Sequence, residues 1–414
     1  MSAEELIALE DRFGAKNYAP LPVVLSHGRG VHLFDVGGRR YLDVMSAYSA
    51  ASFGHRHPRL VAALERQLGR LDLISRAYHS DNLGAFCEKL AELAGLDMCL
   101  PMNTGAEAVE TAIKAARRYG YERRGIAEGK AEIIVAENNF HGRTTTIVGF
   151  SSDPSYRRGF GPFAPGFISV PFGNAAAVDA AIGLNTAAVL VEPIQGEAGV
   201  IVPPDGYLAD LRRICDARGV LLIFDEVQSG FGRTGRTFAF EHENARPDGL
   251  VVGKALGGGL LPVSAFVARH DLMSVFSPGS HGSTFGGNPL AAAVAIEAMR
   301  VLQDENLVAR SEQNGKILRD GLAAVAHPAV REVRGKGLWC GVELDPQQAD
   351  AKDVCLAMAR RGVLTKETHA SVIRFAPPLT MEEADLRMAI DVFAEALNEC
   401  VARGQPQLTP VADE

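Results

Sequence analysis

The chain has 414 residues, 47% of them apolar and 22% charged, and its formal net charge is -8 at pH 7. This length is sufficient to bury the core of one large domain and a smaller one. The negative charge argues against nonspecific binding to nucleic acid, and no uninterrupted apolar run is long enough to span a membrane. We therefore expect a soluble globular protein with neither a nucleic-acid partner nor a membrane partner.

The cysteines and the N-terminus indicate the compartment. The six cysteines are scattered and form no Cys-x-x-Cys pattern, which is typical of reduced thiols in a cytosolic protein. Residues 2–13 are acidic and have the period of a helix, unlike a secretory or transit peptide. Together these features predict a cytoplasmic location.

Residues 1–57 are expected to form an N-terminal segment with one helix and a small antiparallel meander. The helix is predicted over residues 2–13 and the meander over residues 23–44, where short alternating stretches are separated by glycine turns. His55 and His57 end this segment. They could ligate a metal, but no third ligand stands nearby, so we interpret them as turn residues and predict no metal site.

Residues 58–304 are expected to form a large domain of the α/β class. Pro58 begins a predicted helix with apolar residues along one face, namely Leu60, Val61, Leu64, Leu68 and Leu71. From Glu132 onward, short apolar strands alternate with helical patterns, which predicts a mostly parallel sheet flanked by crossover helices. The expected strands are the apolar stretches at 132–136, 187–191, 220–224, 249–252 and 263–268.

A predicted helix that begins near residue 105 could bind an anion. Thr104 and Glu107 have the spacing of a capping box, which places the free backbone N–H groups of the helix N-terminus at Gly105 and Ala106. A glycine there would let a phosphate group approach closely. On its own, the motif is better interpreted as a plain helix cap.

Two neighbouring strand ends supply a carboxylate and an amine. The buried strand 220–224 ends on Asp225, and the strand 249–252 leads to Lys254, which a glycine-rich stretch follows. Ligands of open α/β sheets bind where such strands end, so we expect both side chains in one crevice. A lysine that forms a Schiff base and a carboxylate that keeps a pyridine nitrogen protonated are what a pyridoxal phosphate site needs.

Each half of this pair has another interpretation. Asp225 alone could equally cap a helix or end a strand. Lys254 could be the lysine of a nucleotide-binding loop, but the pattern Gly-x-x-x-x-Gly-Lys-Ser/Thr is not met. Asp248 stands at its first glycine position, and Ala255 follows the lysine. A nucleotide-binding loop is therefore disfavoured.

Further candidates lie just beyond or inside other strands. Phe140 could stack on a planar ring, although a single aromatic residue is more often part of the core. Arg143 and Glu197 follow strands, where charged residues are either functional or at the surface. Arg374 lies inside an apolar strand, and because an unpaired buried charge is costly, we expect it to have a partner or an anionic ligand.

Residues 305–402 are expected to form a smaller α+β domain together with the N-terminal segment. A helix ending near Val325 precedes two strands, a helix ends near Arg361, and two short strands lead to a final helix over Met381–Val401. Residues 403–414 are polar and contain prolines, so we expect a disordered tail.

Several segments occur together in a specific order: SAYSA, LPMNTGAEAVETA, HGRT, FGPFAPGF, VEPIQGEAGV, LLIFDEVQSGFGRTG, GKALGGG, HGSTFGGNPL, VRGKGLW and IRFAPPL. Together they resemble class III aminotransferases, which are pyridoxal-phosphate enzymes of fold type I. The resemblance extends from about Asn17 to Val401. Within that family, the segments are most similar to those of members that transfer the δ-amino group of ornithine.

The resemblance implies a role for each cofactor residue. Lys254 would form the Schiff base with pyridoxal 5'-phosphate and then move protons, while Asp225 would pair with the ring nitrogen. Thr284 would reach in from a second subunit, so the site would lie at a homodimer interface, within a dimer or a higher oligomer. The residues assigned to the cofactor are Lys254, Asp225, Gln228, Phe140, Gly105, Ala106, Thr284 and Ser283.

The resemblance also implies how substrates bind. Tyr18 and Arg143 would hold the α-amino acid end of L-ornithine, and Tyr48 would line the same pocket. Arg374 would bind the α-carboxylate of 2-oxoglutarate, and Glu197 would cover Arg374 while ornithine is bound. A bare arginine would attract the carboxylate of ornithine and present the wrong amine. The implied products are glutamate and glutamate 5-semialdehyde, which cyclises to pyrroline-5-carboxylate.

Other functions remain open. Family members that act on acetylornithine or 4-aminobutyrate share Lys254, Asp225 and Arg374, so these residues do not distinguish the substrates. Tyr18 and Tyr48 favour ornithine, because they suit a pocket for a free α-amino acid end. An aminomutase or decarboxylase is disfavoured, since a paired glutamate and arginine suit two alternating substrates. A noncatalytic scaffold would be expected to lose the lysine or its surroundings, and here all are present.

Overall fold

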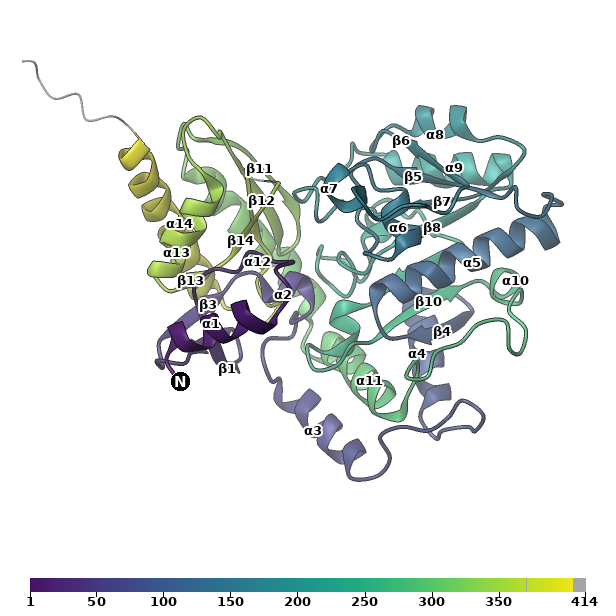
Figure 1. The fold of residues 1–414 in the computed structure, drawn as a ribbon, viewed down its shortest axis with the longest axis horizontal. Coiled ribbons are helices and arrows are strands. Elements are labelled where there is room, and N and C mark those ends of the chain that lie inside the picture. Colours follow the sequence, from purple (N-terminus) through teal and green to yellow (C-terminus); the bar gives the residue numbers. More distant parts are fainter. Residues whose placement is uncertain (370, 405–414) are drawn as a thin grey trace, which may run out of the picture.

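The computed structural model describes residues 1–369 and 371–404, which form two lobes (Figure 1). The larger lobe contains a seven-stranded sheet, and the smaller lobe contains two four-stranded sheets. The short turn α2 (Ser46–Ser49) lies between the lobes. Within the described residues, no helix combines the length and the apolar character needed to cross a membrane.

The sheet of the larger lobe has the strand order β4-β10-β9-β8-β7-β5-β6. Its strands are β4 (Met98–Met102), β5 (Glu132–Ala136), β6 (Phe167–Val170), β7 (Thr186–Val191), β8 (Leu221–Asp225), β9 (Gly249–Val252) and β10 (Ser264–Ala268). The five strands β6, β5, β7, β8 and β9 lie in this order and pair in parallel, which confirms the predicted α/β fold with a mostly parallel sheet.

Strand β10 departs from the prediction, because it is antiparallel to both β9 and β4. A parallel partner needs a crossover of a dozen or more residues, usually with a helix. Residues 253–263, which join β9 to β10, contain only the 3-10 turn η2 (Lys254–Gly257). The connection is therefore too short to return the chain to the start of the sheet.

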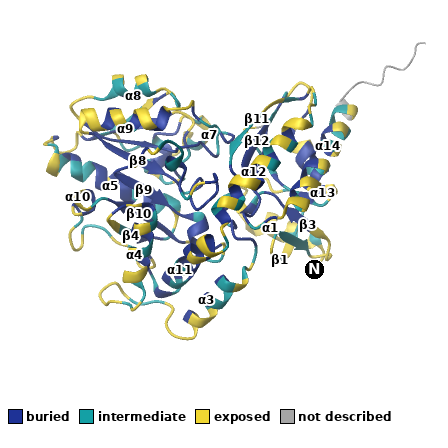
Figure 2. Cartoon of the chain, turned by 180° about the vertical axis from the view of Figure 1, so that it is seen from behind, coloured by how far each residue is buried: buried dark blue, intermediate teal, exposed yellow. Residues whose placement is uncertain are grey.

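Helices cover both faces of this sheet, so its inner strands are buried on both sides, while the edge strands β4 and β6 are partly exposed (Figure 2). Helix α5 packs on one face, against Ile133, Leu221 and Val251, while residues of α4, α9 and α11 share a core with Leu222 and Leu250 on the other face. The helices of this lobe are α3 (Pro58–Leu68), α4 (Leu83–Ala94), α5 (Gly105–Arg123), α6 (Thr145–Gly149), α7 (Pro154–Arg157), α8 (Ala175–Ala181), α9 (Tyr207–Arg218), η1 (Ala239–Glu243), α10 (His270–Met273) and α11 (Pro289–Asp304).

Helix α3 begins at Pro58 as predicted, but its apolar face is shorter than the sequence pattern indicates. Gly69 ends the helix, and its N–H bonds to the carbonyl of Glu65. Leu71 therefore lies beyond the helix, and Leu68 is 60% exposed. Leu60 is fully buried.

Both ends of the chain contribute to the smaller lobe. Strand β13 pairs in parallel with β3, so the antiparallel β1–β3 meander continues into a strand of the C-terminal part. The elements are α1 (Ala3–Phe13), β1 (Leu25–Arg29), β2 (His32–Asp35), β3 (Arg40–Asp43), α12 (Leu307–Ala324), β11 (Val330–Lys336), β12 (Trp339–Leu344), α13 (Ala351–Arg360), β13 (Val363–Leu364), β14 (Lys366–Thr368), β15 (Val372–Phe375) and α14 (Glu383–Gly404). Helix α14 continues past Val401, and residues 405–414 of the expected disordered tail lie outside the described residues.

Candidate active site

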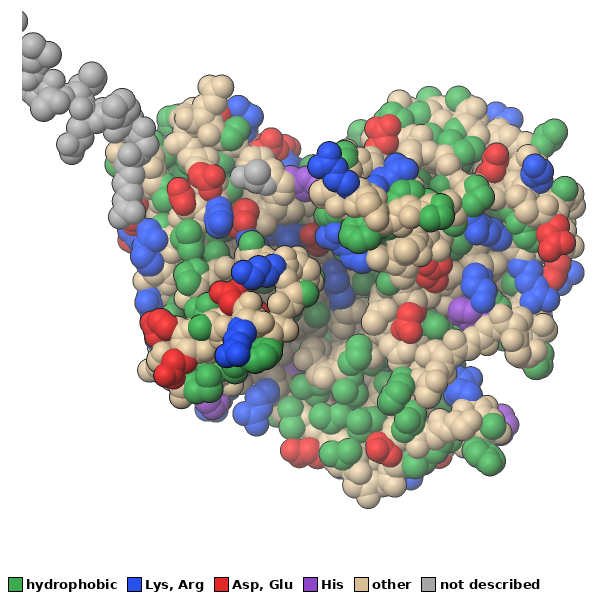
Figure 3. Space-filling view, viewed as in Figure 1, with side chains coloured by type: hydrophobic (Ala, Val, Ile, Leu, Met, Phe, Trp, Pro, Cys, Tyr) green, Lys and Arg blue, Asp and Glu red, His purple; other side chains and the backbone are tan. Residues whose placement is uncertain are grey.

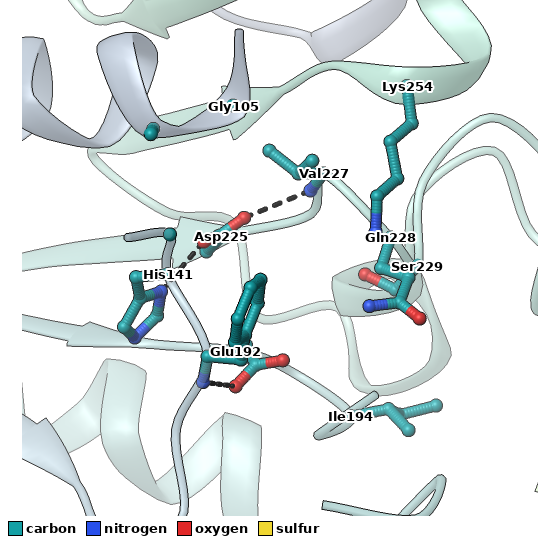
Figure 4. Close-up of a pocket in the computed structure, with 12 residues that line it drawn as sticks. Gly105, His141, Glu192, Ile194, Asp225, Val227, Gln228, Ser229 and Lys254 are labelled. Carbon is teal, nitrogen blue, oxygen red and sulfur yellow. Dashed lines mark hydrogen bonds and ion pairs between the residues drawn. The ribbon is translucent and has the colours of Figure 1, made fainter. Parts of the chain in front are cut away.

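A cavity of about 590 Å³ lies at the ends of the parallel strands in the larger lobe. On the face drawn in Figure 3, the molecule is hollowed between the two lobes, and charged side chains of both signs lie inside the hollow. Figure 4 shows side chains from several strand ends converging on the cavity. The lining residues are Gly105, Ala106, Phe140, His141, Gly142, Glu192, Ile194, Asp225, Val227, Gln228, Ser229 and Lys254.

Asp225 and Lys254 enter the cavity from neighbouring strands, as the sequence predicted for one crevice. Asp225 is the last residue of β8 and is only 5% exposed, while Lys254 follows β9 after a single glycine. One oxygen of Asp225 accepts a hydrogen bond from the Val227 N–H at 3.0 Å. Burial lowers the pKa of Lys254, although the charge of Glu197 opposes this effect. A lower pKa increases the share of free amine, which is the nucleophilic form.

His141 and Glu192 are buried beside Asp225, and the sequence assigned neither of them a role in the site. Nδ1 of His141 lies 2.7 Å from Oδ2 of Asp225 (Figure 4). Burial alone would lower the pKa of His141, but the bond to Asp225 and its charge outweigh burial, and the pKa is raised. The contact with His141 fixes the orientation of the Asp225 carboxylate.

Glu192 directly follows β7, a position comparable to that of Asp225 after β8. Its carboxylate accepts hydrogen bonds from the N–H groups of Phe140 at 3.0 Å and of Gly196 at 3.2 Å. Burial nevertheless raises the pKa of Glu192 to about 7. The position after a parallel strand was a signal that could have identified this residue, because the sequence pattern that singled out Asp225 also applies here.

The N-terminus of helix α5 forms the other end of the cavity. Thr104 and Glu107 make the predicted capping box, and both Gly105 and Ala106 line the cavity. The first N–H groups of a helix have no partner within the helix, so they favour an anion. A Cβ on Gly105 would lie 2.9 Å from a methyl group of Val227, so this position requires glycine.

The groups that line the cavity fit pyridoxal phosphate. The helix N-terminus suits the phosphate, the carboxylate of Asp225 suits a protonated ring nitrogen, and the amine of Lys254 suits an aldehyde. Phe140 and Gln228, which the resemblance assigns to the cofactor ring and its oxygen, also line the cavity.

Arg374 has the partner that its buried position requires. Nη1 of this residue, which is only 4% exposed, lies 2.9 Å from Oε1 of Glu197. Gln228 donates a hydrogen bond to the same carboxylate oxygen at 3.3 Å, and the ring of Tyr48 lies over the guanidinium at 4.5 Å. Burial tends to raise the pKa of Glu197, but the charges of Arg374 and Lys254 outweigh it, so the pKa is lowered.

Arg143 is exposed and lies on two aromatic rings. Its guanidinium carbon is 3.5 Å from the centroid of the Tyr156 ring and 5.4 Å from that of Phe140. Tyr156, on α7, was absent from the predicted site, because a tyrosine in a polar loop carries no pattern that would single it out. The rings place the cation beside the residue expected to contact the cofactor.

Six of the thirteen predicted residues line the cavity. Arg143, Glu197, Arg374 and Tyr48 contact lining residues or one another beside it, whereas Tyr18, Ser283 and Thr284 lie apart from it. Tyr18 belongs to the segment that follows α1 and is 79% exposed. Thr284 is exposed, and Ser283 accepts a hydrogen bond from Asn103 at 2.9 Å, one residue before the capping box. For Thr284, this placement is compatible with the expectation that it serves the site of a second subunit.

The Aminotransferase class-III family matches residues 13–397, so the chain belongs to the class III aminotransferases. The family assignment agrees with the fold and with the lysine and aspartate at adjacent strand ends.

Individual relatives are similar over nearly the whole chain. The curated ornithine aminotransferase 2 of Staphylococcus aureus is 52% identical over 389 residues, which are 94% of this chain and 98% of that protein. The crystal structure of ornithine aminotransferase from Toxoplasma gondii ME49 is 42% identical, with a TM-score of 0.96 over 98% of this chain and 97% of the other. A structure of acetylornithine aminotransferase from Elizabethkingia anophelis is 48% identical, with a TM-score of 0.89 over 96% of this chain and 99% of that one.

Proposed function

We propose that the protein transfers the δ-amino group of L-ornithine to a 2-oxo acid such as 2-oxoglutarate, with pyridoxal 5'-phosphate as cofactor. The products are glutamate 5-semialdehyde, which cyclises to pyrroline-5-carboxylate, and glutamate. The observation that carries the proposal is the ion pair of Arg374 and Glu197 next to Lys254 and Asp225. The relatives named ornithine aminotransferases, from Staphylococcus aureus and Toxoplasma gondii, support it.

The cofactor is supported by the site and by a relative. A second structure of the Toxoplasma gondii enzyme, also 42% identical with a TM-score of 0.96, is described with partial occupancy of PLP at its active site. When bound, the cofactor supplies an aldehyde that takes up the amino group and a ring that accepts electrons.

Two residues of this chain act on protons during the reaction. The carboxylate of Asp225, which His141 contacts at 2.7 Å, would pair with a protonated pyridine nitrogen of the cofactor. The amine of Lys254, whose pKa burial lowers, takes a proton from the carbon that carries the substrate nitrogen and returns one in the step that completes the transfer.

Glu197 and Arg374 select which end of ornithine reacts. With Arg374 paired to Glu197, the carboxylate of ornithine has no free guanidinium near Lys254. The α-amino acid end then binds farther out, at Arg143 and Tyr18, and the δ-amine reaches the cofactor. For the oxo acid, Glu197 moves aside and Arg374 binds the α-carboxylate through two parallel hydrogen bonds.

We further propose that the enzyme works as a homodimer in the cytoplasm. A partner subunit would supply Thr284 to the phosphate end of the cavity. Cys87, Cys99, Cys215, Cys340 and Cys355 are free thiols, which supports a reducing compartment.

A second candidate substrate is N-acetylornithine, because the Elizabethkingia anophelis structure named for it is 48% identical, more than the Toxoplasma gondii structure. Incubation of the purified holoenzyme with 2-oxoglutarate and each amine separately distinguishes the two. The proposal expects glutamate and pyrroline-5-carboxylate from L-ornithine. Faster glutamate formation from N-acetylornithine would assign that substrate instead.

A further inference from the structure

The turn α2, between the two lobes, has an unusual backbone. Ser46, Ala47, Tyr48 and Ser49 all have positive φ angles, of 43°, 47°, 58° and 72°. None of them is glycine, and the left-handed region is unfavourable for residues with a Cβ. A strained segment of this sort persists only where the surrounding structure fixes it.

Arg233 provides much of that fixation. This side chain comes from the larger lobe, in the segment after β8, and it is fully buried. Its Nη2 donates to Ser52 Oγ at 2.9 Å and to Ser46 Oγ at 3.3 Å. Its Nη1 donates to the carbonyls of Leu338 at 2.8 Å and Pro377 at 2.6 Å, in the smaller lobe. One guanidinium therefore joins the turn to both lobes.

The hydrogen bonds of Arg233 go to neutral oxygen atoms. Burial lowers the pKa of Arg233 to about 9, opposed by the charge of Asp43. Asp43 itself accepts hydrogen bonds from the N–H groups of Met45 and Ser46, at the start of the turn. Because a buried charge is costly and adds little net stability, a role in positioning explains Arg233 better than a role in stability alone.

The turn that Arg233 holds carries Tyr48, whose ring lies over Arg374. Ser46 Oγ also donates to the carbonyl of Ala376 at 2.6 Å, two residues beyond Arg374. The turn and the end of β15 are thus fastened together where the carboxylate-binding arginine emerges. A ring packed on one face of a guanidinium restricts its rotation and leaves its edge free for a carboxylate.

We infer that Arg233 is a positioning residue that fixes Tyr48 on Arg374 and thereby determines how tightly the enzyme holds its dicarboxylate substrate. The inference rests on the proposed function, since it takes Arg374 as the site for the α-carboxylate. The effect is larger for the dicarboxylate than for ornithine, because in the proposed function only the dicarboxylate binds Arg374 itself.

Replacing Ser52 with alanine tests the inference with little risk to folding. Ser52→Ala removes one acceptor of Arg233 together with the hydrogen bond from Ser52 Oγ to the Ser49 carbonyl of the turn at 2.8 Å. The matched control Ser311→Ala removes a buried hydroxyl that donates to the backbone carbonyl of Arg233 at 3.1 Å. The hydroxyl of Ser311 makes no hydrogen bond with the turn, so the control reports any general loosening of the core. Arg233→Met removes the whole set of hydrogen bonds as a second, stronger variant.

The measurements are the dissociation constant of glutarate, a dicarboxylate with no amine, by calorimetry on the holoenzyme, and the rate of the half-reaction with L-ornithine. We expect Ser52→Ala to weaken glutarate binding about 5-fold, and Arg233→Met about 20-fold or more, as losses of charged hydrogen bonds would do. The ornithine half-reaction should change less than about twofold in Ser52→Ala, and Ser311→Ala should resemble the wild type in both measurements.

A double-mutant cycle shows whether Arg233 acts through the aromatic ring. In a Tyr48→Leu background, Ser52→Ala should no longer change glutarate binding, because the ring that it positions is absent. Equal effects of Ser52→Ala and Ser311→Ala, or full additivity with Tyr48→Leu, would overturn the inference. A wild-type enzyme that neither binds glutarate nor reacts with L-ornithine would instead refute the proposed function, and the inference with it.

Discussion

At the scale of single residues, burial and neighbouring charges set the chemistry of the site. Lys254 has a lowered pKa because it is buried, and Glu197 has a lowered pKa because Arg374 and Lys254 outweigh its burial. The lowered pKa values favour the free amine of Lys254 and the ionised carboxylate of Glu197. In the proposed function, the ion pair of Arg374 and Glu197 opens when the oxo acid binds.

Glu197→Gln should shift the preference of the enzyme between its two substrates. Without the ion pair, Arg374 is free to bind the carboxylate of either substrate, so the KM for 2-oxoglutarate should fall and L-ornithine should react partly through its α-amine. Chromatography of the products from L-ornithine measures the ratio of α- to δ-transfer. As a control, Glu343→Gln removes an ion pair with Arg334 elsewhere in the smaller lobe and should leave this ratio unchanged.

Glu192→Gln should change how stability depends on pH. The pKa of Glu192 is raised to about 7 from 4.5, so the folded state binds more protons than the unfolded state between these values. Glu192 therefore lowers the free energy of unfolding of the protein as pH rises from 4.5 to 7, by up to roughly 3 kcal/mol. The variant should show a shallower fall of Tm between pH 5 and about 7.5 than the wild type, both measured without cofactor. An unchanged slope would show that other groups cause it.

At the scale of elements, the ends of parallel strands and the start of α5 place the site. Glu192, Asp225 and Lys254 lie at or just after the ends of β7, β8 and β9, and the strands pair in parallel, so their side chains meet at one edge. The capping box fixes where α5 begins and hence where its free N–H groups point. Sequence pattern alone was enough to predict the positions of Asp225 and Lys254 and the capping box, since each depends on local residues, whereas Glu192 was not singled out.

Gly105→Ala should weaken cofactor binding at least about 10-fold. The added Cβ would lie 2.9 Å from Val227, so either the helix start or the lining side chain must shift. Titration of the cofactor-free protein with pyridoxal phosphate measures the affinity. Gly84→Ala is the matched control, because a Cβ there in helix α4 meets nothing within 4 Å. Equal affinities of the two variants would contradict the assignment of the phosphate end.

Other features could not be predicted, because they depend on contacts between distant segments. The left-handed turn at Ser46–Ser49 contains no glycine, so its residues give no local sign of positive φ. His141 reaches Asp225 only because β5 and β8 both flank β7, and Tyr156 meets Arg143 across the start of α6. The antiparallel β10 has the same apolar composition as its parallel neighbours, so composition could not reveal its direction.

At the scale of the whole molecule, the substrate site is shared by the two lobes. Arg374 lies on β15 of the smaller lobe, while Glu197 follows β7 of the larger lobe, and their ion pair crosses between them. The arrangement of the lobes therefore decides whether the carboxylate site is complete. A partner subunit would complete the cofactor site in the same way.

Mixing two inactive variants tests the proposed dimer. Lys254→Ala lacks the amine, and Thr284→Val lacks the hydroxyl proposed to act in the partner's site. In a mixed dimer, one site combines an intact Lys254 with an intact partner Thr284, so coexpression should restore about a quarter of wild-type activity. No recovery in mixed dimers, isolated by two affinity tags, would place Thr284 in the site of its own subunit.

The central claim is that this site converts the δ-amine of ornithine. The most direct measurement follows the absorbance of the bound cofactor in the wild-type holoenzyme, without oxo acid, as amines are added one at a time. The account predicts that L-ornithine changes the cofactor spectrum far faster than N-acetylornithine or 4-aminobutyrate does. A faster response to N-acetylornithine would contradict the substrate assignment, and no response to any amine would contradict the role of Lys254.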